Sequence, residues 1–394
     1  MQRFLKSDVL STGLAMFSMF FGAGNVIFPL LLGQWAGDKN IFAILGLCIT
    51  AVLVPFTGLI GMMLYEGDYE KFFARIGKGP GFVLALLIMG LIGPFGGMPR
   101  CIALSHATFS VSHSECPLWL FSVIACVVIF AFTWNKNKIV KVLGYVLTPL
   151  LLGSLLIIIV KGMLFSPAAP IVNETMGRAF LHGILEGYNT LDLLAAFFFS
   201  TIVITALKES QKKANVVGKE ALEETSCRRM LSITFRASML GAFLLTAVYV
   251  GFSFIASFHS QHLPTSTPDQ LLGVMAFHLL GPQGGWIANA AVSLACLTTA
   301  VTLAAVFSEF LETRVFQGKV GYAPCLLITL VGAFLISKLK FTGIVAFLLP
   351  ILEISYPALI LLTLLNIAYK LFNFRPVKFP VFATFAIALL LYLL

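Results

Sequence analysis

The sequence predicts an all-α polytopic membrane protein, and three observations carry this prediction. Of the 394 residues, 59% are hydrophobic and 11% are charged, whereas a soluble domain carries about 25% charged residues. The mean hydropathy is +0.97. The apolar residues form long continuous runs, without the alternation that is typical of a membrane β-barrel. So little polar surface cannot cover a globule of this size, which excludes a cytosolic enzyme, a secreted disulfide scaffold and a disordered chain.

Eleven apolar runs are long enough to cross a membrane, because a hydrocarbon core of about 30 Å needs roughly 20 helical residues. They cover residues 9–37, 41–65, 81–109, 117–134, 142–165, 179–207, 237–258, 285–308, 320–337, 341–369 and 379–394. The first run is interpreted as a retained helix, since it is too long for a signal peptide and no small-residue cleavage site follows it. The last run is still hydrophobic at Leu394, so the prediction is 11–12 transmembrane helices.

The basic residues predict the orientation of the chain. With the N-terminus in the cytoplasm, 20 of the 26 Lys and Arg residues lie on the cytoplasmic side, and five lie outside. Positive residues concentrate in cytoplasmic loops, so this bias explains the net charge of +9 without a nucleic-acid partner. The hydrophilic stretch 208–236 is expected to be a solvated, amphipathic cytoplasmic linker.

The first apolar run contains features that interrupt a helix. Gly22, Gly24, Asn25 and Pro29 lie within eight residues, and glycine and proline both weaken helices. A straight helix over 9–37 would also be about 43 Å long, longer than the membrane is thick. Unwound backbone at membrane depth is tolerated only where it lines a cavity or contacts a ligand, so the sequence predicts a break here.

The sixth run contains a second interruption at Gly187, Asn189 and Thr190, which Glu186 and Asp192 flank. The two breaks occupy matching positions if 9–165 and 179–369 are two five-helix repeats, followed by an additional helix at 379–394. Because five is an odd number, the second repeat must be inverted in the membrane. Broken helices in matching positions of inverted repeats predict a single transporter domain over 1–394, with its site near the bilayer midplane.

Five motifs resemble one bacterial family. These are FSMFFGAGNVIFP (17–29), IGPFGGMPR (92–100), EGYNTLDLLA (186–195), LACLTTAV (294–301) and LLPILEISYP (348–357). Together they resemble the branched-chain amino acid:cation symporters over nearly the whole chain. The resemblance implies a multi-pass protein of the bacterial inner membrane that imports leucine, isoleucine and valine with Na⁺. A proton-coupled carrier of another small amino acid, and less favourably a passive channel, stay open as alternatives. The sequence does not predict an oligomeric state.

A branched-chain amino acid would need partners for a carboxylate, an ammonium group and an apolar side chain. The free amides at the start of the half-helix at Gly24–Asn25 suit the carboxylate. Backbone carbonyls at Phe20, at Phe21 and around 187–189 suit the ammonium group, and Met19 and Phe20 suit the apolar part. The full set of substrate-binding candidates is Met19, Phe20, Gly22, Ala23, Gly24, Asn25, Gly187, Tyr188, Asn189 and Thr190.

The resemblance also implies a cation site between the first and eighth helices. Its ligands would be the carbonyls of Ser18, Phe21 and Ala295 and the hydroxyls of Thr298 and Thr299, and oxygen ligands suit a hard cation such as Na⁺. From the residues alone, hydrogen bonds of the two threonines to their own helix or to a neighbouring helix are favoured over ion coordination.

Charged residues inside the membrane are functional candidates. Asp192 is the coupling candidate for a proton-driven mechanism, or else a structural partner for Arg100 or a tyrosine. Arg100 is expected to pair with a carboxylate. No nucleophile and base occur at a convincing spacing, and no cofactor motif is present in the sequence, so the chain is not expected to be an enzyme.

Overall fold

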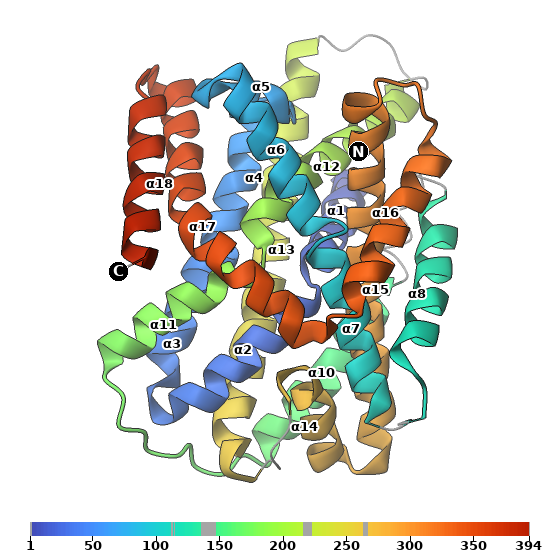
Figure 1. Cartoon of the computed structure of the whole chain (residues 1–394), viewed down its shortest axis with the longest axis vertical. Helices are drawn as coiled ribbons and strands as arrows, with labels where there is room; N and C mark the ends of the chain where they lie inside the picture. The colour runs from blue at the N-terminus through green and yellow to red at the C-terminus, as the bar shows by residue number, and fades with distance from the viewer. Residues whose placement is uncertain are drawn as a thin grey trace.

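The chain folds into a bundle of helices (Figure 1). The computed structural model describes residues 2–393 apart from 112, 114, 135–146, 216–222 and 263–266, and this part of the chain contains helices and turns but no strand. Five helical stretches are each long and apolar enough to cross a membrane, or six when the bent pair α11–α12 counts as one. The remaining apolar helices have 10–17 residues. The all-α membrane architecture is confirmed.

The first repeat follows the predicted segments. The first predicted segment consists of two half-helices, α1 (Gln2–Phe20) and α2 (Ala23–Ala36). The others are α3 (Asn40–Cys48) with α4 (Val54–Leu64), α6 (Lys78–Ile92) with α7 (Gly97–Ser110), α8 (Leu118–Thr133) and α10 (Thr148–Leu164). Short elements join them: 3-10 turns at Gly37–Lys39 and Ala74–Ile76, a π-helical turn at Ile49–Leu53, and α5 (Tyr69–Phe73). The predicted start of the fifth segment, at 142, lies outside the described residues.

The second repeat begins with α11 (Met176–Tyr188) and α12 (Asp192–Asn215). Then come α13 (Glu223–His259), α14 (Leu271–Leu280), α15 (Pro282–Phe310), α16 (Tyr322–Ser337) and α17 (Lys340–Phe372), and the additional helix α18 (Lys378–Leu393). Shorter turns lie at Ser260–His262, Pro268–Gln270 and Leu311–Val315. Residues 208–215 and 223–236 of the predicted linker are helical, because α12 and α13 extend beyond their apolar parts, while 216–222 lie outside the described residues. α14 is a helix that was not predicted.

The first and sixth helices are broken where the sequence predicted it. α1 ends at Phe20 and α2 begins at Ala23, while α11 and α12 meet at an angle of 43°. Leu191 in this second break has φ +67°, a left-handed conformation that costs a side-chain-bearing residue free energy. The surrounding structure therefore imposes this second break.

Pro29 is not part of the first break, contrary to the sequence interpretation. It lies inside α2. A proline interrupts one hydrogen bond, here the one that would reach the Asn25 carbonyl, and the remaining turns can continue the helix. The actual interruption is at Phe21–Gly22, where the backbone of Gly22 is extended and a Cβ atom would lie 2.9 Å from Thr299 Cγ2.

A third break, between α6 and α7, was not predicted. The segment Gly93–Gly96 leaves the helix, although the backbone N–H groups of Met98 and Arg100 still donate to the Gly93 and Gly96 carbonyls. A Cβ atom on Gly97 would lie 2.2 Å from the Ile92 carbonyl oxygen. The run of glycines therefore permits a turn too tight for larger residues.

The broken helices lie in the interior of the bundle. α1 and α2 pack against α13, α7 packs against α15, and α12 packs against α4. In Figure 1, α8 and α18 lie at opposite edges of the bundle, α5 lies near one end and α14 at the other. The outer helix α18 exposes large apolar side chains such as Phe379, Leu391 and Leu393, as expected of a helix that faces lipid.

Candidate functional site

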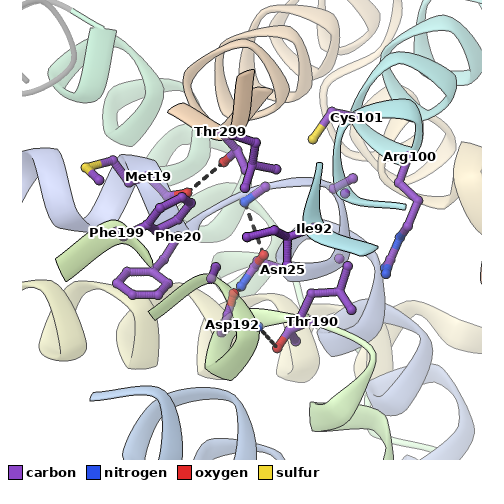
Figure 2. A pocket seen from close by; sticks show the side chains of 17 residues that line it. Met19, Phe20, Asn25, Ile92, Arg100, Cys101, Thr190, Asp192, Phe199 and Thr299 are labelled. Atoms are coloured by element: carbon purple, nitrogen blue, oxygen red, sulfur yellow. Dashed lines mark hydrogen bonds between the residues drawn. The ribbon is translucent and has the colours of Figure 1, made fainter. Parts of the chain in front are cut away.

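A cavity lies where the three breaks meet (Figure 2). Its walls come from the end of α1, the start of α2, both sides of the α6–α7 break, the start of α12 and the middle of α15. The lining residues are Met19, Phe20, Gly22, Ala23, Gly24, Asn25, Ile92, Gly97, Arg100, Cys101, Thr190, Leu191, Asp192, Ala195, Phe199, Thr299 and Leu303. Nine of them are residues that the sequence singled out as substrate, cation or coupling candidates.

Asn25 connects the two predicted breaks. Its Oδ1 accepts a hydrogen bond from the Gly22 N–H at 3.1 Å, and its Nδ2 donates to Asp192 Oδ2 at 2.6 Å. Asn25 Nδ2 also contacts the hydroxyl of Tyr249 on α13, and this hydroxyl donates to the same Asp192 oxygen at 3.1 Å. One side chain thus caps the start of α2 and ties it to α12 and α13. Asp192 has a tyrosine partner, one of the two structural roles expected for it.

The two threonines of α15 reach across to the end of α1. Thr298 Oγ1 donates to the Ser18 carbonyl at 2.9 Å and is 2.9 Å from the Ala295 carbonyl. Thr299 Oγ1 lies 3.1 Å from the Met19 carbonyl and 3.3 Å from the Ser18 carbonyl. Four of the five residues predicted as cation ligands therefore come together. Phe21 does not join them by any described hydrogen bond; its ring stacks on Phe17 instead, with centroids 5.2 Å apart.

The cavity has an aromatic wall and a polar wall. Met19, Phe20 and Phe199 lie on one side in Figure 2, with Arg100 and Cys101 on the other. The rings of Phe20 and Phe199 meet edge to face, with centroids 5.3 Å apart. Between the two walls lie Asn25, Thr190 and Asp192. Such an amphiphilic cavity suits a small molecule with charged groups at one end and an apolar group at the other.

Arg100 occupies the polar wall, and the expectation that it pairs with a carboxylate is wrong for the described part of the chain. Its side chain is 2% exposed, yet Nε and Nη2 have no hydrogen-bond partner there. The reason is geometric. Asp192, the carboxylate expected as its partner, accepts its hydrogen bonds from Asn25 and Tyr249.

Three predicted substrate residues do not line the cavity. Gly187 packs against the π-helical turn Ile49–Leu53, where a Cβ atom would lie 1.9 Å from Thr50 Oγ1. Tyr188 stacks on Tyr356 of α17, with ring centroids 4.7 Å apart. Asn189 donates to Glu186 Oε2 at 3.1 Å. α11 ends at Tyr188, before the chain reaches the cavity at Thr190. These three residues therefore pack α11 and its end against neighbouring parts of the bundle.

Several lining residues were missed. They are Ile92, Gly97, Cys101, Leu191, Ala195, Phe199 and Leu303, together with Arg100 in its role as a wall of the cavity. Most are apolar residues in apolar helices, which no local pattern distinguishes from residues that face lipid. The glycine-rich IGPFGG stretch was the one available signal for a third break.

This arrangement of broken helices around an amphiphilic cavity agrees with the family comparison. The sequence profile of the branched-chain amino acid transport protein family matches residues 5–393. The chain belongs to this family. It is therefore a transport protein rather than an enzyme, as its relatives are.

Curated relatives cover most of this branched-chain amino acid transport protein. A branched-chain amino acid permease BrnQ of Corynebacterium glutamicum is 31% identical over 368 residues, which is 92% of this chain and 81% of the relative. A putative branched-chain amino acid carrier protein of Staphylococcus aureus is 32% identical over 393 residues, covering 93% and 82%. Another, of Staphylococcus haemolyticus, is 30% identical over 386 residues, covering 93% and 83%.

Solved structures show the fold of this family member. A manganese transporter of Eremococcus coleocola is similar with a TM-score of 0.64 at 16% identity, over 99% of this chain and 86% of the other. Inward-facing Mhp1 is similar with a TM-score of 0.59 at 14% identity, over 98% and 88%. The likeness confirms a fold of inverted five-helix repeats with broken first helices.

Proposed function

We propose that this chain imports leucine, isoleucine and valine together with Na⁺, as a secondary active transporter that works by alternating access. The observation that carries the proposal is the cavity at the meeting point of the three helix breaks, with an aromatic wall opposite a polar one. Membership of the branched-chain amino acid transport protein family supports the substrate class. Selection among the three substrates is expected to be loose, since one methylene in an apolar pocket changes binding by about 1–3 kcal/mol.

The Thr298–Thr299 group supports Na⁺ as the coupling ion. The Thr298 hydroxyl lies within hydrogen-bond distance of the Ser18 and Ala295 carbonyls, and the Thr299 hydroxyl lies within hydrogen-bond distance of the Ser18 and Met19 carbonyls. A small, hard cation prefers oxygen ligands of this kind, and rotation of the hydroxyl hydrogens away from the carbonyls would turn lone pairs toward it. The group also touches the cavity, because Thr299 and Met19 belong to both, so ion and substrate can influence each other.

The size of the cavity supports a mechanism with moving walls. Its volume of about 30 Å³ is room for about two water molecules, so leucine would require the surrounding helices to separate. The breaks in α1–α2, α6–α7 and α11–α12 are places where half-helices can pivot. One charge that moves through 100 mV contributes about 2.3 kcal/mol, which exceeds the 1.4 kcal/mol needed for each tenfold accumulation.

The distribution of charge supports a bacterial inner-membrane location with a cytoplasmic N-terminus. α5 and the turn before α18 lie at one end of the bundle (Figure 1). Lys71, Arg75, Lys370 and Arg375 lie in these two regions and around them, and Arg75 Nη2 donates to the Arg375 carbonyl at 3.3 Å. By the preference of basic residues for the inside, this end faces the cytoplasm.

The proposal is tested by uptake of labelled leucine into proteoliposomes. Vesicles carry an inward Na⁺ gradient, an equal K⁺ gradient or an inward proton gradient, each with and without a membrane potential. Accumulation that needs Na⁺, together with counterflow after preloading with leucine, is the expected result. Accumulation with protons alone would replace Na⁺ coupling by proton coupling, with Asp192 as the first carboxylate to test. Absence of leucine flux under every gradient would overturn the proposed function.

A further inference from the structure

Arg100 is a buried cation whose hydrogen-bond donors are largely unused. It lies in the first turn of α7, 2% exposed, and lines the cavity. Its Nε and Nη2 atoms have no hydrogen-bond partner among the described residues, and no carboxylate among these residues lies within ion-pair distance. A buried charge without a partner strongly destabilises a fold. Stability therefore does not explain an arginine at this position, and a role in function does.

Aromatic rings hold the guanidinium without using its N–H groups. Its central carbon lies 5.2 Å from the ring centroid of Phe28 on α2 and 5.3 Å from that of Phe341 on α17. Cation–π contact of this kind is made through ring faces, so the donors in the plane of the guanidinium stay free. The arginine is oriented, and its donors remain available for a ligand.

Arg100 also lies where two other breaks converge. A Cβ atom on Gly24 would lie 2.9 Å from Arg100 Nη2, 3.0 Å from the Asn189 carbonyl oxygen and 3.0 Å from Thr190 Cα. The glycine thus leaves the space in which the guanidinium approaches the start of α2 and the α11–α12 break.

We propose that Arg100 binds the carboxylate of the transported amino acid. The inference rests on the proposed function and adds a residue that specifies the substrate. A planar guanidinium matches a carboxylate through two parallel hydrogen bonds, and the positive end of α2 adds to the same field. The apolar side chain then points toward Phe20 and Phe199, which lie on the opposite side of the cavity (Figure 2).

The charges of the cavity complement a zwitterion. Its two described charged groups are Arg100 and Asp192, and the Asp192 carboxylate already has hydrogen bonds from Asn25 and Tyr249. A bound amino acid supplies the missing anion for Arg100 and places its ammonium group toward Asp192. Compounds that keep the ammonium group and the isobutyl chain but lack the carboxylate leave the arginine unpaired and are expected to bind weakly.

The first test uses the wild-type protein and three ligands. Dissociation constants are measured by calorimetry in detergent for leucine, leucinol and leucinamide, which share the side chain and the amine. Leucine is expected to bind ~10- to 100-fold more tightly than either analogue, as a charged hydrogen-bonding pair implies. Equal affinity for the three ligands overturns the inference. Failure to bind any of them overturns the proposed function and with it the inference, so the two failures are distinguishable.

The second test compares variants. Arg100→Gln is expected to lower leucine affinity ~10- to 100-fold while leucinol affinity changes less than about threefold, which removes the discrimination. Arg100→Lys keeps the charge without the planar fork and is expected to be intermediate. The matched control is Arg75→Gln, since Arg75 also rests on an aromatic ring, 3.7 Å from the Tyr369 centroid, but lies outside the cavity. Two results would overturn the inference for the Arg100→Lys or Arg100→Gln protein. One is a preference for leucine over leucinol by the wild-type factor, and the other is an equal loss of affinity for both ligands.

Discussion

Asn25 Nδ2 and Asp192 Oδ2 lie 2.6 Å apart, although 167 residues separate them in the chain. Each residue lies in the first turn of the second half of a broken helix, Asn25 in α2 and Asp192 in α12. Tyr249 of α13 contacts both side chains. This three-residue group therefore fixes the two half-helices relative to each other beside the cavity.

Replacing Asn25 with alanine is expected to weaken both the fold and the site. The variant removes a donor to Asp192 and the acceptor for the Gly22 N–H, and a hydrogen bond to a charged group contributes about 1.5–3 kcal/mol. We expect a lower melting temperature in detergent and at least a tenfold loss of leucine affinity. Asn366→Ala is the matched control, because Asn366 is also fully buried but donates to the Phe72 carbonyl. It should lose stability and keep leucine affinity; equal affinity in both variants would contradict the role of Asn25.

Replacing Asp192 with asparagine isolates the charge from the shape. The side-chain oxygen of asparagine can still accept from Asn25 and Tyr249, so the protein is expected to fold. The loss of the negative charge near the substrate ammonium and the cation should reduce Na⁺-driven leucine accumulation at least tenfold in proteoliposomes. Glu186→Gln serves as the control, since Glu186 flanks the same break but lies outside the cavity. Full accumulation by the Asp192→Asn protein would reduce Asp192 to a structural residue.

The sequence was sufficient for features that depend on local chemistry. Long apolar runs define the helices because each must span about 30 Å of hydrocarbon. Glycine and asparagine within two residues of each other in FFGAGN and EGYNT predict the breaks in the first and sixth helices. The third break was overlooked because residues 81–109 fit one long helix, and glycines in membrane helices usually serve packing. Because this break was not predicted, the position of Arg100 at the cavity was not predicted either.

Partnerships across the bundle could not be predicted from the sequence. Tyr249 lies in the apolar middle of α13, and nothing near it in the sequence indicates a contact with Asp192, 57 residues away. Phe199 is one of 37 phenylalanines, so its place in the cavity depends on how α12 leaves the break. Conversely, Tyr188 belongs to the EGYNT motif yet stacks on Tyr356, because a motif identifies a segment and the helix rotation decides which side chains face the cavity.

The threonines of α15 are expected to control the response to Na⁺. Both hydroxyls reach carbonyls at the end of α1, so Thr298→Ala with Thr299→Ala removes two candidate ligands. We expect the Na⁺ concentration for half-maximal leucine uptake to rise at least tenfold, while leucine binding at saturating Na⁺ is weakened less.

Thr302→Ala is the matched control for this pair. Thr302 lies one turn further along α15 and is equally buried, but its hydroxyl donates to the Thr298 carbonyl within the same helix. Its Na⁺ dependence should stay at the wild-type value. If the double variant also keeps that value, the cation binds elsewhere.

Gly24 is expected to tolerate no side chain. A Cβ atom there would lie 2.9–3.0 Å from Arg100 Nη2, the Asn189 carbonyl oxygen and Thr190 Cα, and two of these three neighbours are backbone atoms that cannot rotate away. Gly24→Ala should therefore separate the two breaks by a few tenths of an ångström and abolish leucine uptake, with normal insertion in the membrane. Gly153→Ala, in α10, is the control, since nothing lies within 4 Å of its added Cβ and alanine stabilises a helix by about 0.5–1 kcal/mol relative to glycine. Uptake by the Gly24→Ala protein at the Gly153→Ala level would show that the close approach of Arg100 to the breaks is not needed for transport.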